Sequence, residues 1–377
     1  MKFIHISDLH LGKRLHETSL IEDQEAILNQ ILNIIDAEKP SGIFIAGDIY
    51  DKSSPSAEAV ALFDFFISEL AKRHLQVFII SGNHDSAERI AFGSKILDAT
   101  GIHLSPVYNG EIQPTKLTDE YGEIDVYMLP FVKPSHVRRF YENENIESYT
   151  DAIKVAIDKM NLNNANRNVL ITHQFVTGAT RSESEESVGG TDNVDARVFA
   201  NFDYVALGHL HGPQNCGDIK IRYSGTPLKY SFAEANDTKS VTVIELKEKG
   251  ANLDVKTVEL KPIRDMKKIR GEFNEIINLT DRTEDYVQIT LTDEDDIPNA
   301  MSRLQNVYKN ALDLRYDNTR TRTNTEILSA ENVETKSPFE LFSDFFKESN
   351  NAEMCEQQSE YIKSLIEKIE GGQSWDL

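Results

Sequence analysis

Cysteine is nearly absent from this chain of 377 residues, which has only Cys216 and Cys355. Two cysteines do not suggest a disulfide framework, so we expect a reducing, cytoplasmic compartment. The chain also lacks any apolar stretch of about 18 residues, the length that crosses a membrane, and its N-terminus runs directly into a strand-like segment. We therefore expect no transmembrane helix, no signal peptide and no association with a membrane.

Positive charge is scarce as well, because 40 Lys and Arg residues stand against 62 Asp and Glu residues, a net charge of −22. Proteins that bind nucleic acid unaided usually present a basic surface, so this balance argues against tight binding of DNA by the chain alone. Acidic residues that hold divalent cations would, however, reverse the local field. The charge therefore leaves open DNA as a substrate that a partner delivers.

The residues that are present predict an α/β fold. Up to residue 105, strands are expected at 3–6, 42–46 and 75–80, with helices at 17–38 and after Ser56, a favourable N-cap. This βαβαβ order favours a parallel sheet. The later elements of this first unit, residues 1–270, are expected to be a helix at 151–160 and strands at 124–129, 168–172, 204–207, 219–224, 240–246 and 253–260.

The rest of the chain predicts smaller parts. Residues 271–317 would form a β-α-β capping domain, with strands at 286–291 and 312–316 around a helix at 297–311. Residues 318–337 are expected to be a linker. A helical tail, 338–377, would begin at Pro338 and carry the apolar residues Phe339, Leu341, Phe342, Phe345, Phe346, Ile362, Leu365, Ile366 and Ile369. Such a tail either packs on its own domain or docks on a partner.

Four apolar segments each end in residues that commonly bind metals. They lead into Asp8-Leu9-His10, Gly47-Asp48, Gly82-Asn83-His84-Asp85 and Gly208-His209-Leu210-His211. Ligand sites of α/β proteins lie just beyond the carboxyl ends of strands, so these segments are expected to converge. Asp, Asn and His donors without a thiol favour a divalent cation such as Mn²⁺ over a structural zinc ion. One such segment would carry little weight, but four in order predict a metal site.

Together these motifs resemble the calcineurin-like metallophosphoesterases, whose isolated metal-binding histidine is matched by His173 in Leu170-Ile171-Thr172-His173. Within that superfamily the chain is similar to the SbcD nuclease subunits. The similarity rests on residues 5–12, 46–51, 80–85, 129–131, 206–211, 223–232 and 337–342. It implies a metallophosphoesterase β-sandwich flanked by helices, followed by a small cap and a tail that binds the partner.

The resemblance also implies an activity. Family members are two-metal DNA nucleases, exonucleases on duplex DNA and endonucleases on single strands and hairpins, which act with SbcC, a coiled-coil ATPase, in DNA end processing, recombination, replication and repair. It implies two Mn²⁺ ions and a homodimer of this subunit within a heterotetramer. By motif position, Asp8, His10 and His211 would hold one metal and Asn83, His173 and His209 the other. Asp48 would bridge them, and His84 would be the catalytic histidine.

Two neighbouring residues leave alternatives open. Asp85 would orient His84 as a supporting carboxylate, although the N-cap of a helix fits the same position. Asp51 departs from relatives that carry histidine there, which puts a role for this position near the phosphate in doubt.

The sequence disfavours two other functions for this chain. A phosphatase on the same scaffold is disfavoured because Lys52 does not complete the Asp-Arg-Gly extension typical of Ser/Thr protein phosphatases. A non-catalytic docking subunit is disfavoured because every ligand position is filled. The polar segment 180–195 would be either a solvated loop or a control of substrate access.

Overall fold

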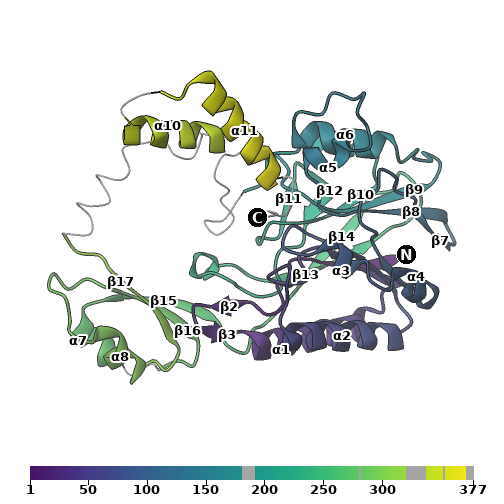
Figure 1. Cartoon of the computed structure of the whole chain (residues 1–377). Helices are drawn as coiled ribbons and strands as arrows, with labels where there is room; N and C mark the ends of the chain where they lie inside the picture. Colours follow the sequence, from purple (N-terminus) through teal and green to yellow (C-terminus); the bar gives the residue numbers. More distant parts are fainter. Residues whose placement is uncertain (181–191, 280–281, 320–336, 351–352, 371–377) are drawn as a thin grey trace.

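The computed structural model describes residues 1–180, 192–279, 282–319, 337–350 and 353–370 (Figure 1). Most of the predicted linker at 318–337, and most of the polar segment at 180–195, therefore lie outside the described residues. So does the side chain of Ile369. No helix in the described ranges is long and apolar enough to cross a membrane.

The first of two large sheets has six strands in the order β14-β13-β1-β4-β5-β6. Strands β1, β4 and β5 are parallel, as predicted, and β6, a strand that the sequence analysis did not predict, continues the parallel order. β13 and β14 add to the edge in antiparallel pairings. The strands are β1 (Lys2–Ile6), β4 (Gly42–Ala46), β5 (Gln76–Ile80), β6 (Ile102–Leu104), β13 (Ser240–Glu245) and β14 (Asp254–Glu259).

The second sheet also has six strands, in the order β11-β12-β10-β9-β8-β7. Its four central strands are parallel, and β7 and β11 pair antiparallel at the two edges. The strands are β7 (Thr115–Asp119), β8 (Gly122–Leu129), β9 (Arg167–His173), β10 (Tyr204–Gly208), β11 (Gln214–Cys216) and β12 (Asp218–Tyr223).

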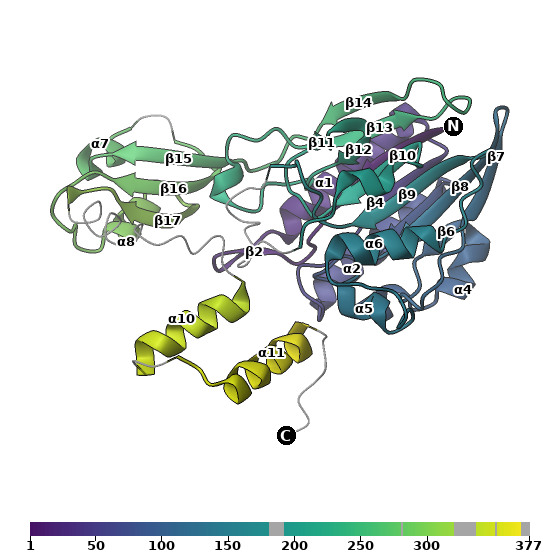
Figure 2. The ribbon, with the colours of Figure 1, turned by 90° about the horizontal axis from the view of Figure 1, so that it is seen from above.

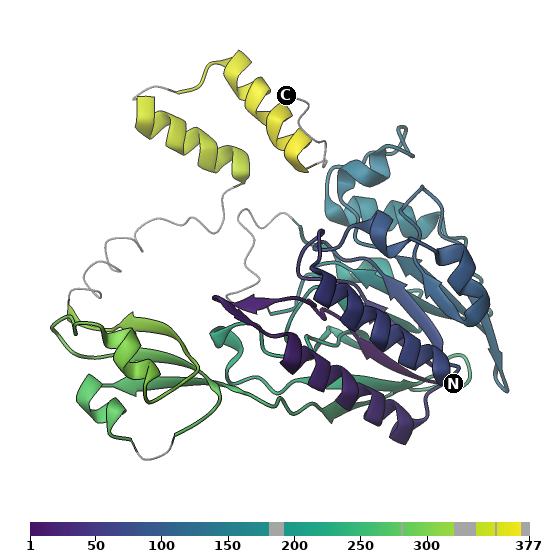
Figure 3. The ribbon, with the colours of Figure 1, turned by 60° about the horizontal axis from the view of Figure 1, so that its bottom comes forward.

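The two sheets pack face to face, and helices cover their outer faces. Successive side chains of a strand point to opposite sides, so Phe44 packs between the sheets while Ile43 and Ile45 pack beneath helices. Those helices are α1 (Ile21–Glu38) and α2 (Ala57–Lys72), and α5 (Pro134–Arg138) and α6 (Tyr149–Asp158) cover the other sheet (Figures 1 and 3). This is the predicted sandwich flanked by helices. Burial of both faces explains the continuous apolar runs of the central strands.

Two helix starts illustrate how local chemistry sets the boundaries. The Ser56 hydroxyl accepts a hydrogen bond from the Ala59 N–H at 3.2 Å, which confirms Ser56 as the N-cap of α2. The helix predicted from residue 17 begins only at Ile21. A short hairpin of β2 (Arg14–Leu15) and β3 (Thr18–Ser19), which turns at His16 with a φ of 52°, takes up the first residues of the predicted helix.

A separate three-stranded parallel sheet lies beside the β2–β3 hairpin (Figures 1 and 2). It contains β15 (Met266–Gly271), β16 (Tyr286–Leu291) and β17 (Ala311–Tyr316), joined through α7 (Phe273–Ile277) and α8 (Ala300–Gln305). The sequence placed β15 with the first unit, whereas it pairs along its length with β16. This strand was missed because only two of its six residues are apolar and its charged residues are exposed.

The last elements that the structure describes are two helices, α10 (Pro338–Asn350) and α11 (Glu356–Glu370). Pro338 begins the first of them, as expected. The Ser337 hydroxyl accepts a hydrogen bond from the Glu340 N–H at 3.2 Å, and the Glu340 carboxylate accepts one from the Ser337 N–H at 2.6 Å. Reciprocal capping of this kind stabilises a helix start without tertiary contacts.

Candidate metal centre

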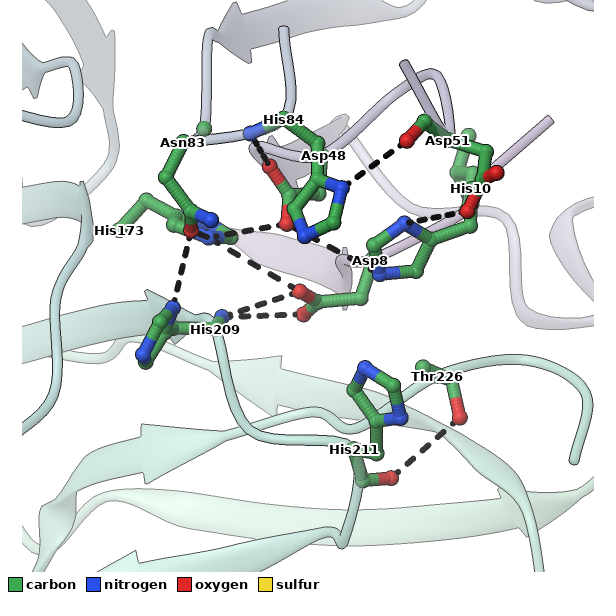
Figure 4. A network of polar contacts seen from close by, with 12 residues as sticks. Asp8, His10, Asp48, Asp51, Asn83, His84, His173, His209, His211 and Thr226 are labelled. Atoms are coloured by element: carbon green, nitrogen blue, oxygen red, sulfur yellow. Dashed lines mark hydrogen bonds and ion pairs between the residues drawn. The ribbon is translucent and has the colours of Figure 1, made fainter. Parts of the chain in front are cut away.

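The sequence motifs converge where strands of both large sheets end (Figure 4). Asp8, Asp48 and Asn83 follow β1, β4 and β5 of the first sheet, and His173 and His209 end or follow β9 and β10 of the second. The parallel strands finish on the same side of the sandwich. The geometry therefore joins residues from opposite layers, as their positions after the strands predicted.

Unusual backbone conformations direct the side chains of Asp8, His10 and Asp48 toward the site. Asp8, His10 and Asp48 have φ angles of 54°, 43° and 50°, a region that residues other than glycine seldom occupy. Such conformations cost on the order of 1–3 kcal/mol each and persist where the surroundings impose them. Here the Asp8 N–H donates to the Gly47 carbonyl oxygen at 3.0 Å, and the His10 N–H donates to that of Asp48 at 3.0 Å. The loops after β1 and β4 thus hold each other in place.

The glycine before Asn83 and the glycine before His209 allow the layers to approach closely. A Cβ atom on Gly82 would lie 2.1 Å from Oδ1 of Asp48, and one on Gly208 would lie 1.9 Å from the Ala46 carbonyl oxygen. Both contacts are shorter than any side chain tolerates. These positions therefore require glycine because of packing between loops.

Asp48 occupies the centre of the site. Its Oδ2 lies 3.3 Å from Nε2 of His173 and 3.8 Å from Nε2 of His10. Two groups of potential ligand atoms, each within 4.8 Å of one another, share Asp48: one with Asp8 and His173, the other with His10 and His84. This carboxylate is thus the one side chain common to both groups among the described residues.

Asn83 joins the histidines of the second sheet. Its Oδ1 lies 3.0 Å from Nε2 of His173 and 3.0 Å from Nδ1 of His209 (Figure 4). The main-chain N–H of His209 donates to both carboxylate oxygens of Asp8 at 3.1 Å. The predicted set of Asn83, His173 and His209 is therefore assembled around a single amide oxygen.

The residues fit a metal ion because one buried histidine has no hydrogen-bond partner among the described residues. In the described part of the chain, neither ring nitrogen of His10 has a hydrogen-bond partner, although the side chain is only 2% exposed. A buried polar group without a hydrogen-bond partner destabilises the folded state, so the two ring nitrogens of His10 indicate that this site binds a ligand. Burial also lowers the pKa of His10 well below its usual value. His10 is thus kept in the neutral form that binds metals.

The electrostatics also leave room for a cation. Burial, with a contribution from nearby Asp48, raises the pKa of Asp8 to about 6. Burial opposes ionisation of Asp48 as well, but the charge of His173 holds the Asp48 pKa below its ordinary value. Against its own burial, the same ion pair raises the pKa of His173 to about 9. A dication would provide the positive charge that these carboxylates lack and would displace the His173 proton.

His84 is held by the main chain of Asp51. Its Nδ1 lies 2.9 Å from the Asp51 carbonyl oxygen, which makes Nδ1 the protonated nitrogen, and its main-chain N–H donates to Oδ1 of Asp48 at 2.9 Å. The Asp51 carboxylate instead pairs with Lys13 at 2.7 Å. Asp51, which departs from the family pattern, therefore contacts the predicted catalytic His84 through the Asp51 carbonyl oxygen, not through its side chain.

The prediction that Asp85 orients His84 is wrong. The Asp85 carboxylate accepts hydrogen bonds from the N–H groups of Ile49, Tyr50 and Gly82, at 3.1, 3.0 and 2.9 Å. The N-cap alternative is also wrong, because Ser86 caps the following helix, α3 (Ala87–Ile90). Burial raises the pKa of Asp85 to about 6. Its structural part is to tie the loop after β5 to the loop after β4, whose buried N–H groups need acceptors.

His211 lies at the edge of the site, with its ring centroid 5.3 Å from that of His10. Its Nδ1 is 3.1 Å from Oε1 of Glu234, a residue that the sequence reasoning missed. Against the effect of burial, the hydrogen bond from His211 and the charge of Lys239 lower the pKa of Glu234 to about 2. Only the position of Glu234, just after the family-like segment 223–232, could have drawn attention to it.

Another missed residue supports the loop that carries His10. The Gln24 amide nitrogen donates to the His10 carbonyl oxygen at 2.7 Å and to the Tyr230 hydroxyl at 3.1 Å. Its amide oxygen accepts the Gly12 N–H at 3.0 Å. Tyr230, which belongs to segment 223–232, also donates to the Leu9 carbonyl oxygen. That segment therefore contributes to the site by fixing its backbone.

Comparison with known proteins gives two family-model matches. One is the calcineurin-like phosphoesterase family, over residues 1–213, and the other is the type 5 capsule protein repressor C-terminal domain, over residues 262–350. A curated protein from Staphylococcus epidermidis, named as the D subunit of the SbcCD nuclease, is 32% identical over 380 residues, which span 98% of this chain and 99% of that protein.

Solved structures give more distant matches. A dimetal phosphatase from Danio rerio is 11% identical with a TM-score of 0.41, over 68% of this chain and 95% of that one. A protein from Thermus thermophilus is 11% identical with a TM-score of 0.36, over 68% of this chain and 98% of that one.

Proposed function

Because the chain belongs to the calcineurin-like phosphoesterases and, among them, to the family of SbcD nuclease subunits, we propose that it hydrolyses phosphodiester bonds of DNA at a two-metal site. The observation that supports this most is the sharing of Asp48 between two groups of potential ligands. A carboxylate that belongs to both groups would hold two ions close together. A single-metal site would need no such shared residue.

The proposed ligands are those that the motifs predict. They divide differently from the two groups above, in which Asp8 lies with His173 and His84 lies with His10. Asp8, His10 and His211 would hold one metal, Asn83, His173 and His209 the other, and Asp48 both. Oxygen and imidazole donors without thiolate suit Mn²⁺, which we propose as the ion. When bound, two such ions lower the pKa of a water and neutralise charge that develops on the phosphate. Neutral Asn83 adds a ligand without cancelling that positive charge.

His84 would act on the phosphate itself. The Asp51 carbonyl oxygen engages Nδ1, so Nε2 is the ring nitrogen left to meet the substrate. The side chain is exposed, its ring centroid lies 4.9 Å from that of His10, and Figure 4 shows the ring beside Asp48. A histidine in this position can stabilise the phosphate oxygens or donate a proton to the leaving oxygen. Asp85 contributes only by holding the loops together.

A comparison of substrates tests the proposed function. We expect the purified chain with Mn²⁺ to cleave linear duplex and single-stranded DNA, to do so more slowly with Ca²⁺, and to stop in excess chelator. p-Nitrophenyl phosphate, a phosphomonoester, should be turned over poorly. If DNA stays uncleaved while the monoester is hydrolysed rapidly, the chain is a phosphatase instead.

We propose that the remaining parts of the chain have the predicted roles, with the start of the capping domain moved so that it includes β15. The cap of β15, β16 and β17 would select which DNA reaches the site. Asp23 of α1 joins the cap to the first domain. Its Oδ2 accepts a hydrogen bond from the hydroxyl of Tyr286 of β16 at 2.8 Å and another from Arg264, just before the cap, at 2.8 Å. An Asp23→Ala variant should therefore lose duplex cleavage more than hydrolysis of bis(p-nitrophenyl) phosphate, and equal losses would contradict the proposal.

The homodimer also belongs to the proposal. Its support is a pair of exposed apolar residues that line one hollow, Val60 on α2 and Phe92 just after α3, which are 44% and 85% exposed. Large apolar residues grouped on a surface usually mark a contact with another protein. Sedimentation of the full chain at micromolar concentration tests this, and a monomer would contradict it.

We further propose that residues 338–377 dock on an SbcC-like coiled-coil ATPase. Phe342 and Phe345 lie 6.3 Å apart between ring centroids and are 37% and 62% exposed on α10, which also carries Phe339, Leu341 and Phe346. Exposed aromatic anchors on a helix suit docking into a groove of another protein.

A chain that ends at residue 337 should keep its melting temperature and its Mn²⁺-dependent cleavage but lose co-purification with the ATPase and any stimulation by ATP. The point variant Phe345→Asp should weaken the same interaction, while Phe140→Asp, at an exposed phenylalanine beside α5, serves as its control. If the tail packs on its own domain, truncation should instead lower the melting temperature. Unchanged binding of the ATPase would reject docking.

A further inference from the structure

A buried carboxylate and a buried amine lie against His211. Glu234 is 1% exposed and Lys239 is 3% exposed. Oε1 of Glu234 is 3.1 Å from Nδ1 of His211, and Oε2 accepts a hydrogen bond from Nζ of Lys239 at 2.6 Å. The same Nζ donates to the main-chain oxygen of His211 at 3.0 Å. The pair therefore contacts His211 at both its ring and its backbone.

Stability alone gives little reason for this arrangement. Taking two opposite charges out of water costs free energy that their attraction often does not recover. Glu234 also ends a short 3₁₀ turn, Phe232–Glu234, which Ser231 already caps by accepting the Ala233 N–H at 3.1 Å. The turn thus has its own local support, and the carboxylate is directed at a proposed metal ligand.

We propose that Glu234, backed by Lys239, is a positioning residue that sets the tautomer and orientation of His211 for metal binding. A carboxylate that accepts from Nδ1 keeps the proton there and leaves the lone pair on Nε2 for the metal. The negative charge also makes that lone pair a better donor. This role rests on the proposed function, because it requires His211 to hold a metal.

Lys239 explains how the carboxylate can serve without disturbing the site. The centre already holds two buried carboxylates, Asp8 and Asp48, so a third negative charge nearby would add repulsion. Lys239 balances that charge at 2.6 Å, closer than its 3.4 Å contact with the Asp237 carboxylate, and also fixes the main chain of His211. His173 is oriented differently, since its Nδ1 lies 2.8 Å from the neutral Ala46 carbonyl oxygen. The two proposed metals would therefore depend on Glu234 unequally.

The test measures metal binding to the full chain without DNA. In Glu234→Gln the amide keeps the side chain's shape, but it cannot accept from both His211 and Lys239. Loss of such a supporting carboxylate typically weakens metal affinity about 10–100-fold. We expect this loss of affinity for one of the two bound Mn²⁺ ions. Calorimetry and electron paramagnetic resonance would measure it. The ¹⁵N shifts of His211 should change from the Nδ1-protonated tautomer to a mixture.

Two further variants keep the test decisive. Glu234→Asp retains the charge but is one methylene too short to reach both partners, so it should show the same loss at one metal even if Glu234→Gln folds poorly. Asp119→Asn breaks another pair of the same domain, in which Arg167 Nη1 donates to Asp119 at 3.0 Å. This control should lower the melting temperature and leave the affinity for both metals unchanged.

The outcomes separate this proposal from the proposed function. If folded Glu234→Asp or Glu234→Gln binds both metals with wild-type affinity, the positioning role is overturned. In that case a loss of one metal in His211→Ala would still support the two-metal site. If the wild-type chain binds no second metal, or His211→Ala keeps both, the ligand assignment itself fails.

Discussion

Replacement of Asp48 by alanine is expected to abolish DNA cleavage and to remove bound metal. Asp48 is 2% exposed, reaches toward His10 and His173 with the same oxygen, and is the carboxylate that both groups of potential ligands share. Without it, two ions held close together would lose the negative charge between them. We expect the rate to fall by more than about 10³-fold, at or beyond the upper end for a single electrostatic group. Metal content after dialysis and a cleavage assay measure both effects.

Asp48→Asn is the matched variant, because it keeps the shape and the acceptor for the His84 N–H but removes the charge. It should retain the melting temperature of the wild-type chain better than Asp48→Ala while losing metal. Two metals retained in folded Asp48→Ala, or wild-type cleavage in excess chelator, would refute the two-metal mechanism.

The second large effect is expected for His84→Ala. A general acid or base contributes about 10² to 10⁴ in rate, and we expect a loss in this range with both metals retained. The structure also offers a contrary possibility, because His84 has a nitrogen within 4.8 Å of ligand atoms of His10 and Asp48. Metal content together with single-turnover cleavage distinguishes a residue that acts on the phosphate from a ligand.

Loss of one metal in His84→Ala would therefore reassign His84 as a ligand. His74→Asn is a suitable control for replacing an exposed histidine, since His74 lies beyond the end of α2. Its φ of 53° is one that asparagine tolerates. This variant should cleave DNA at the wild-type rate.

The sequence determined the strands that carry the site and most of the side chains at it. Central strands buried on both faces must be apolar throughout, so β1, β4, β5, β9 and β10 could be located to within a residue or two. Because parallel strands end at one edge, the Asp, Asn and His residues after them could be placed together before any coordinates were known. Their chemistry also predicted a divalent metal, since it depends only on donor type.

Tertiary structure decided which residues support that site. Gln24 meets Tyr230 across 206 residues of sequence, and the His209 N–H meets Asp8 across 201. Asp85 stands next to His84 in sequence, yet its carboxylate turns to the N–H groups of another loop. Glu234 and β15 carry no local pattern that reveals their partners. A strand pattern reports which face is buried, whereas the partner of a polar side chain depends on which distant loop the folded chain brings within hydrogen-bonding distance.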